Sequence, residues 1–227
     1  MISETQKVEI LSRSFIFSAL TGEELTGLAR MAIERRFTAE QFIFIEEDAP
    51  DWFYIIADGK VKAVKHTSLG KEIIIAFFGN GEMFGEVAVF ENKPYPASAQ
   101  AVSETRLLGI RREDFLSFLV KQPLVALGII NVLAGRLREA QSRLRDLAGE
   151  RVEQRLARML LMLSAKLGAE LPFTRQELSD MAGTTTETTI RILSQWKSRK
   201  IIGSVRGRIT ILDETKLRLL AEGRPRV

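Results

Sequence analysis

Residues 127–144 place the members of a regular seam at intervals of three, four, three, four and three positions. This spacing is typical of the a and d positions of a coiled coil, and no proline interrupts residues 124–171. We expect a rod of about 25 helical residues, on the order of 38 Å long, that pairs with a second copy of itself. The alternative is a core helix inside one domain. The seam positions are Leu127, Ile130, Ala134, Leu137, Gln141 and Leu144.

The sequence before this rod has a different pattern of apolar residues. Residues 1–35 carry apolar residues at helical spacing, with a helix start at Thr21–Glu24. From 36 to 110, short apolar runs alternate with turn signals, a pattern that favours an antiparallel barrel or jelly roll. Residues 59–78 indicate a hairpin, with His66 beside its turn TSLG. The apolar runs are FIFI (42–45), WFYII (52–56), IIIAFF (73–78) and LLGI (107–110).

Charge divides the chain into two unequal parts. Residues 1–120 hold 13 Lys and Arg against 18 Asp and Glu, a net charge of −5, whereas residues 121–227 hold 20 against 11, a net charge of +9. A polyanion is attracted to the second part and not to the first. Because solvated charge alone can produce such a skew, it indicates nucleic acid only if a docking motif lies in the basic part.

Several classes of chemistry are excluded by composition. The 227 residues include no cysteine and one histidine, His66. Disulfide scaffolds, thiolate zinc sites, cysteine-held iron–sulfur clusters and cysteine nucleophiles are therefore ruled out. No recognisable catalytic cluster of carboxylates is present either, so we expect neither an enzyme nor a metal site. No run of 18 apolar residues exists, and MISETQKVEI is no signal peptide, so we expect a cytoplasmic protein without membrane contact.

A docking motif does lie in the basic part, at residues 173–202. Thr174 and Glu177 have the spacing of a capping box, which begins a helix. Ala182-Gly183-Thr184 then predicts a tight turn, and a second helix starts near Thr185. Two helices joined by a short glycine-containing turn form a helix-turn-helix. The residues expected to face inward are Leu178, Met181, Ile190, Leu193 and Trp196.

Residues 201–212, IIGSVRGRITIL, indicate two short strands around a basic turn. Such a hairpin is the wing of a winged helix, whose Arg206 and Arg208 would contact phosphates. Another apolar helix is expected over residues 152–167. The sequence therefore predicts an α+β chain with three parts: an N-terminal β-roll (1–120), a long helix (121–148) and a C-terminal winged helix-turn-helix (149–227).

The second helix of this motif, residues 185–199, exposes an acidic and a basic residue one turn apart. Glu187 can accept from cytosine N4, and Arg191 can bind guanine O6 and N7. Two structural interpretations compete with base reading: an intrahelical Glu187–Arg191 salt bridge, or a second capping box in which Glu187 pairs with Thr184. The hydroxyl residues that begin the helix are either phosphate donors or caps.

These motifs resemble the bacterial transcription factors typified by the cyclic-AMP receptor protein and the fumarate–nitrate reduction regulator. The similarity covers nearly the whole chain, above all GEMFGEVAVF (81–90), PASAQA (96–101) and TRQELSDMAGTTTETTIRIL (174–193). It implies an effector-sensing β-roll, a dimerisation helix and a homodimer that reads an inverted repeat in double-stranded DNA. The implied base readers are Glu187 and Arg191, and the implied phosphate contacts are Thr174, Gln176, Thr185 and Thr188. Thr186 replaces the family's first DNA-contacting arginine, so a different base preference is expected there.

The ligand motif departs from the family pattern. Gly85 and Glu86 match the pair that holds the ribose in cyclic-nucleotide binders, but Pro96 and Ala97 stand where Arg and Ser hold the phosphate. On the long helix, Arg136 matches a family position, whereas Ala140 and Gln141 replace the Thr-Ser pair that meets the adenine. Cyclic AMP is therefore not the expected effector. Glu86 would then be structural, bonded to strand ends or paired with Arg136, and Gln141 would fix the seam's register or face a ligand.

Three alternatives follow from the resemblance. Some relatives sense gases through haem, and His66 is the single imidazole available for one; the other interpretation is an exposed turn histidine. Regulators of the nitric oxide and denitrification type share the PYPAS stretch (94–98). A cyclic-nucleotide-binding module with a protein partner is the third alternative. For the β-roll itself, an apolar ligand or no ligand at all are further alternatives. If the chain activates transcription, RNA polymerase is a further expected partner.

Overall fold

The computed structural model describes residues 2–66, 72–205 and 207–223. The chain forms two compact units, Met1–Leu137 and Arg138–Val227. The long helix α5, Pro123–Gly149, contains the boundary between them and corresponds to the expected rod. Among the described helices, no single one is long and apolar enough to cross a membrane; one pair, Arg112–Lys121 with Pro123–Ser142, passes the test together but is bent by 112°.

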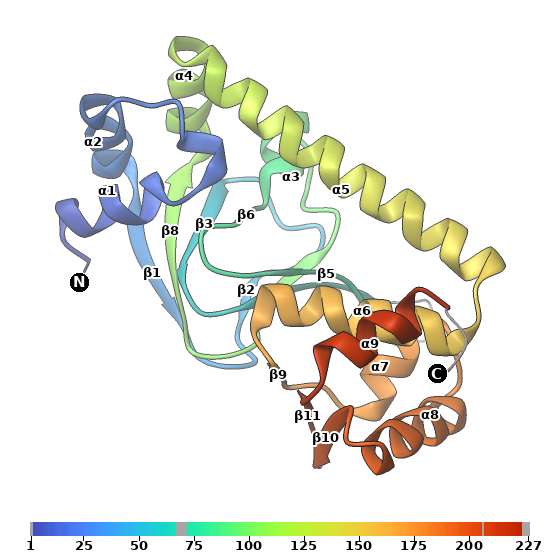
Figure 1. Cartoon of the computed structure of the whole chain (residues 1–227). Coiled ribbons are helices and arrows are strands. Elements are labelled where there is room, and N and C mark those ends of the chain that lie inside the picture. Colours follow the sequence, from blue (N-terminus) through green and yellow to red (C-terminus); the bar gives the residue numbers. More distant parts are fainter. Residues whose placement is uncertain (1, 67–71, 206, 224–227) are drawn as a thin grey trace. The chain divides into compact units, whose positions relative to one another are not determined.

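The first unit is built on two four-stranded antiparallel sheets, as the alternating apolar runs predict (Figure 1). The strands are β1 (Ile33–Phe37), β2 (Phe42–Phe44), β3 (Trp52–Asp58), β4 (Val61–His66), β5 (Glu72–Phe78), β6 (Met83–Phe84), β7 (Ser98–Ala101) and β8 (Thr105–Arg111). One sheet has the order β1-β8-β3-β6 and the other β2-β7-β4-β5. The β4–β5 pairing confirms the expected hairpin, whose turn TSLG lies outside the described residues.

Side-chain alternation divides the first sheet between two cores. On β3, Tyr54 and Ile56 point between the sheets, while Phe53 and Ile55 point to the other face. Between the sheets, Tyr54 lies against Phe84 with ring centroids 5.2 Å apart. The interior of the roll is thus filled by aromatic and aliphatic side chains. Its buried members are Tyr54, Ile56, Val61, Phe78, Phe84, Ala99 and Leu107.

The other face of the first sheet is covered by helices. Phe53 stacks on Phe115 of α4 with centroids 4.0 Å apart, and Leu28 and Ile129 join the same core. The helices of this unit are α1 (Glu4–Ser12), the 3-10 turn η1 (Phe15–Phe17), α2 (Gly22–Met31), α3 (Glu86–Glu91), α4 (Arg112–Lys121) and the first part of α5. The helix start expected at Thr21–Glu24 is confirmed, and Thr21 and Glu24 form a capping box there.

The apolar spacing predicts helical structure up to residue 35, but the last helix of this segment ends at Met31. Ile33, counted with the helical residues, is the first residue of β1 and pairs with Gly109. The backbone turns extended at Ala32, because Ile33–Phe37 completes a ladder with β8 and that pairing outweighs apolar spacing.

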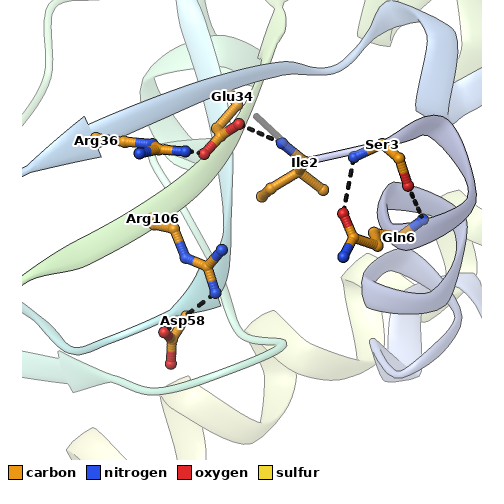
Figure 2. Close-up of polar contacts among 7 residues, drawn as sticks. All are labelled: Ile2, Ser3, Gln6, Glu34, Arg36, Asp58 and Arg106. Atoms are coloured by element: carbon orange, nitrogen blue, oxygen red, sulfur yellow. Dashed lines mark hydrogen bonds and ion pairs between the residues drawn. The ribbon is translucent and has the colours of Figure 1, made fainter.

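Polar contacts attach the N-terminal segment to this sheet (Figure 2). The backbone N–H of Ile2 donates to the carboxylate of Glu34, which also accepts from Arg36 Nε at 2.7 Å. Ser3 and Gln6 form a capping box that begins α1. These bonds fix the start of the chain on β1.

The second unit is smaller and mostly helical. Its elements after α5 are α6 (Val152–Leu167), β9 (Glu170–Leu171), α7 (Arg175–Met181), α8 (Thr186–Ser198), β10 (Ile202–Val205), β11 (Arg208–Ile211) and α9 (Glu214–Ala221). Helix α6 has the bounds that the sequence predicts, and it packs on α9. The strands form one sheet in the order β10-β11-β9. Leu160 of α6, Trp196 of α8 and Leu217 of α9 are fully buried.

Candidate functional site

Helix α7 begins as the sequence predicts. The Thr174 side chain accepts from the backbone N–H of Glu177 at 3.2 Å, and the Glu177 carboxylate accepts from the N–H of Thr174 at 2.7 Å. This capping box satisfies two of the donors that a helix start leaves free. Leu178 faces inward as expected, but Met181 is only half-buried, and Ser179 is the fully buried residue beside Leu178.

Four residues, 182–185, join α7 to α8, the last of them being the N-cap of α8. Gly183 has φ +61°, the left-handed region that favours glycine, and its N–H donates to Asp180 O. The N–H of Thr184 donates to Ser179 O. The two helices and this turn form the expected helix-turn-helix.

Helix α8 begins one residue later than a Thr184–Glu187 capping box requires. Thr185 is the N-cap, and its hydroxyl oxygen accepts from the backbone N–H of Thr188 at 3.2 Å. The capping-box interpretation of Glu187 is therefore wrong. The hydroxyls of Thr174 and Thr185 are confirmed as caps, while their phosphate contacts stay a prediction.

The inward face of α8 also differs by one position from the expectation. Leu193 and Trp196 are buried as predicted, but Ile190 is 41% exposed. Ile192 and Thr189 occupy the core instead, because positions 189, 192, 193 and 196 share one helix face and 190 lies about 100° away from 189.

Another hydroxyl residue of the helix start, Thr186, contacts the protein itself. Thr186 Oγ1 donates to Gln176 Oε1 at 2.6 Å, and Gln176 Nε2 donates to Asp180 at 3.0 Å. Thr186 Oγ1 also lies 3.3 Å from Ser179 Oγ. These bonds tie the first turn of α8 to α7.

Glu187 and Arg191 are both exposed on α8. Within the described part of the chain, neither side chain makes a hydrogen bond or an ion pair. The alternative of an intrahelical salt bridge is thus not realised, and both groups are open to a partner. Lys197, Arg199 and Lys200 continue an exposed basic surface at the end of the helix.

The strands β10 and β11 form the expected hairpin, with Val205 opposite Arg208. Arg208 is exposed and forms an ion pair of 3.3 Å with Glu170 of β9. Arg206 lies outside the described residues. Gly207, with φ +72°, allows the tight turn at this wing.

In the first unit, Glu86, which matches a ribose-binding position of cyclic-nucleotide binders, is bonded to another residue of the chain. Glu86 begins α3, its side chain is 5% exposed, and it pairs with Arg136 Nη1 of α5 at 2.6 Å. Arg136 Nη2 donates to Met83 O at 2.6 Å, and the guanidinium lies 4.9 Å from the Phe78 ring centroid. The expected pairing of Glu86 with Arg136 is confirmed.

Gly85 holds this carboxylate close to the roll's aromatic core. It has φ +81°, and an added Cβ would lie 3.2 Å from Trp52 O and 3.3 Å from the Tyr95 ring. Tyr95 stacks on Phe44 with centroids 3.7 Å apart, and its hydroxyl donates to Trp52 O at 2.6 Å. Neither a larger residue nor a different backbone fits here without displacing these groups.

The other predicted effector positions offer little polar chemistry. Pro96 is exposed and Ala97 half-buried, so neither supplies a cation or a hydroxyl. Ala140 and Gln141 are exposed on α5. His66 is exposed at the last residue of β4, which confirms the exposed-histidine interpretation and gives a haem no buried imidazole.

The seam of α5 is open along its length. The four large apolar residues among the expected positions are 56–68% exposed, Ala134 is half-buried and Gln141 is exposed. The four are Leu127, Ile130, Leu137 and Leu144. The interpretation of this helix as fully buried core is therefore wrong for this face.

One residue that contacts the helix-turn-helix has no role in the sequence-based prediction. Arg155 of α6 donates to backbone oxygens of Ala182 and Gly183, both at 3.1 Å. In the sequence it is one of two arginines on an amphipathic helix, and only its bonds to the turn, once the fold is known, distinguish it.

A β-roll, a long helix and a winged helix-turn-helix define a class of DNA-binding regulators. Residues 34–122 match the cyclic nucleotide-binding domain, and residues 154–220 match the Crp-like helix-turn-helix domain. The "Cyclic AMP receptor protein" of Thermus thermophilus is 34% identical, with 92% of this chain and 97% of the relative covered. A CRP-like cAMP-activated global transcriptional regulator of Mycobacterium tuberculosis is 28% identical, with the same coverage. The structure of FixK2 from Bradyrhizobium japonicum matches with a TM-score of 0.71, 26% identity, and 83% and 96% of the chains covered.

The chain belongs to the CRP/FNR family of effector-controlled, DNA-binding transcription regulators. This membership confirms the resemblance drawn from residues 81–101 and 174–193, and with it the expectation of a regulator and not an enzyme.

Proposed function

We propose that the chain works as a homodimer that reads an inverted repeat with α8. The support for the dimer is the exposed stripe on α5, where four large apolar side chains share one helix face. Burial of such a stripe against a second copy is the usual source of coiled-coil stability. Two recognition helices related by a two-fold axis would then lie about one helical turn of DNA apart, roughly 34–36 Å.

The observation that carries the proposed base reading is the exposed, unbonded pair on α8. Glu187 accepts from cytosine N4 and Arg191 donates to guanine O6 and N7 in the proposed complex. Thr186 is bonded to Gln176 and so contributes no base contact of the kind that an arginine would make there. We therefore expect an operator that differs at the corresponding base from those read by arginine-bearing relatives.

Phosphates are the proposed partners of the residues around α8. Thr174, Gln176, Thr185 and Thr188 surround the two helix starts, where backbone N–H groups also favour anions. On the wing, Arg208 and Arg206 are the proposed phosphate contacts. Arg208 would exchange its exposed bond to Glu170 for one to the backbone of the duplex.

The effector proposed for the junction of the roll and α5 is a ligand other than cyclic AMP. A cyclic phosphate would find no cation or hydroxyl at Pro96 and Ala97, and charge-assisted hydrogen bonds of this kind contribute about 1.5–3 kcal/mol each. The ribose-binding carboxylate is in addition already paired with Arg136.

Cyclic AMP is nevertheless the second candidate, because the names of two relatives state that they respond to it. A calorimetric titration with cyclic AMP and cyclic GMP separates the two. We expect no heat of binding for either nucleotide; saturable binding of one would make it the effector, with Arg136 as the available cation.

Selection of bound duplexes from a random pool tests the function as a whole. We expect enrichment of an inverted repeat with half-site centres one helical turn apart, bound by two chains. Absence of any enriched sequence, or binding by single chains, would overturn the proposal. Arms with haem plus nitric oxide report whether that ligand changes the affinity, and transcription in vitro reports whether RNA polymerase is recruited.

A further inference from the structure

The guanidinium of Arg155 joins two connections of the second unit. Nε donates to Ala182 O and Nη2 to Gly183 O, both at 3.1 Å, while Nη1 donates to Glu150 O at 2.7 Å. Ala182 and Gly183 belong to the turn before α8, and Glu150 lies between α5 and α6. Three donors of one planar group thus hold three carbonyl oxygens from two separate segments.

Two carbonyl oxygens of the turn receive their hydrogen bonds from the Arg155 side chain. Its backbone N–H groups are satisfied by α7, because Ala182, Gly183 and Thr184 donate to oxygens of Leu178, Asp180 and Ser179. The carbonyls of Ala182 and Gly183 point the other way and are bonded by Arg155. Since the N-cap Thr185 follows two residues after Gly183, the direction in which α8 leaves the turn is set where Arg155 acts.

An arginine suits this position better than a lysine. The guanidinium is planar and presents five N–H donors in a fixed fork, whereas an ammonium is a single point on a flexible stem. A lysine at this position keeps the positive charge, which favours the carboxyl end of α7, but it cannot bond the three oxygens in one plane.

We propose that Arg155 is a positioning residue for DNA recognition: it fixes the orientation of α8 and links it to the backbone of the α5–α6 connection. This inference rests on the proposed function of α8. Arg155 itself contacts no base in the proposal and acts only through the turn. Its loss is expected to reduce discrimination between DNA sequences, not the general attraction to phosphates.

The test compares the full chain with Arg155→Lys, Arg155→Met and a control, Arg158→Lys. Arg158 lies one turn further along α6 and bonds the Glu150 carboxylate and Ala221 O. Affinity is measured for the duplex that the wild type selects and for an unrelated duplex, each over a range of salt concentrations. The unfolding midpoint is recorded for every variant.

We expect both Arg155 variants to bind the selected duplex about ten-fold more weakly. For Arg155→Lys, which keeps the charge, affinity for the unrelated duplex, its salt slope and the unfolding midpoint should match the wild type. Arg158→Lys should retain the wild-type ratio between the two duplexes. Hydrogen exchange at the Gly183 and Thr184 amides should be faster in Arg155→Lys.

Two results would overturn the inference: an unchanged ratio in both Arg155 variants, or a parallel fall for both duplexes together with a lower unfolding midpoint. The second result would give Arg155 a purely structural role. A wild type that prefers no duplex would instead contradict the proposed function, and it is recognised before any variant is measured.

Discussion

Glu187 and Arg191 lie one turn apart on the exposed face of α8, yet no bond joins them and neither is held by another described residue. An exposed i, i+4 ion pair would have contributed only about 0.3–0.5 kcal/mol. The two side chains therefore keep their conformational freedom until a partner orders them, and they are matched in chemistry to the edges of a G·C base pair.

Replacement of Arg191 by alanine should weaken binding to the selected duplex by about 1–3 kcal/mol and relax the preference at one position of each half-site. The reason is loss of a bidentate contact to guanine. Competition with single-base variants of the duplex measures this. Arg199→Ala, at the exposed C-cap of α8, is the matched control; equal weakening on every sequence would make Arg191 a phosphate contact instead.

Removing a positive charge and removing a negative charge from the wing region should have opposite effects on the affinity for DNA. Arg208→Ala should weaken binding to all duplexes and reduce the salt slope by about one. Glu170→Gln should strengthen binding to all of them, because it removes the carboxylate that Arg208 contacts. Titrations at several salt concentrations distinguish these effects, and an unchanged slope in Arg208→Ala would remove the wing from the interface.

The seam of α5 should determine the oligomeric state. Leu137→Lys places a charge where a second copy is expected to pack, so the dimer should dissociate. Light scattering gives the mass of the particle in solution. Glu139→Lys, exposed on the same helix but off the seam, should leave the mass unchanged; a dimer that persists in both Leu137→Lys and Ile130→Lys would contradict the proposed interface.

Removal of one member of the Glu86–Arg136 pair should destabilise the first unit strongly. Arg136→Met leaves a carboxylate that is 5% exposed without its cation, at a cost of about 3–5 kcal/mol. The double variant Glu86→Gln with Arg136→Met should recover part of that loss, since no buried charge remains. Denaturant unfolding measures both. Equal stability of the wild type and Arg136→Met would show that the pair is not formed in solution.

The two tyrosines should titrate only in strong alkali. Burial raises the pKa of Tyr54 to about 12, and burial raises the pKa of Tyr95 as well. Since an unfolded tyrosine ionises near pH 10, their stabilising contribution is fully present below about pH 10 and is lost as the pH rises toward 12. Tyrosinate absorbance of the folded chain should therefore rise later than that of the chain in denaturant. Coincident curves would mean that the roll is open.

Features that are local in the sequence were predictable. The helix start at Thr21–Glu24 and the capping box at Thr174–Glu177 need only four residues each, and both mark the start of a helix correctly. The errors at Ile33, Ile190 and Glu187 arise where a strand pairing or a shift of one residue decides the outcome. Apolar spacing alone does not record such choices.

Contacts between distant segments were less accessible. Glu86 and Arg136 are 50 positions apart, and their pairing was expected as one of two structural roles because the missing phosphate ligands left Glu86 without a partner. Arg155 bonds carbonyls 27 and 28 positions away. Because every residue has a backbone carbonyl oxygen, no residue type in the turn indicates that an arginine side chain will donate to these oxygens.

The bond between Arg136 and Glu86 affects how a ligand can enter this roll. A molecule that bonds the carboxylate oxygen held by Arg136 would displace the guanidinium, so the event would be an exchange whose net free energy is a difference between two sets of bonds. The affinity of such a ligand would depend on how far its contacts with the carboxylate and with the rest of the roll outweigh the bonds that Arg136 gives up. Each such exchange would also break the bond between Glu86 of α3 and Arg136 of α5, so entry of the ligand would coincide with the loss of one contact between this helix and the roll.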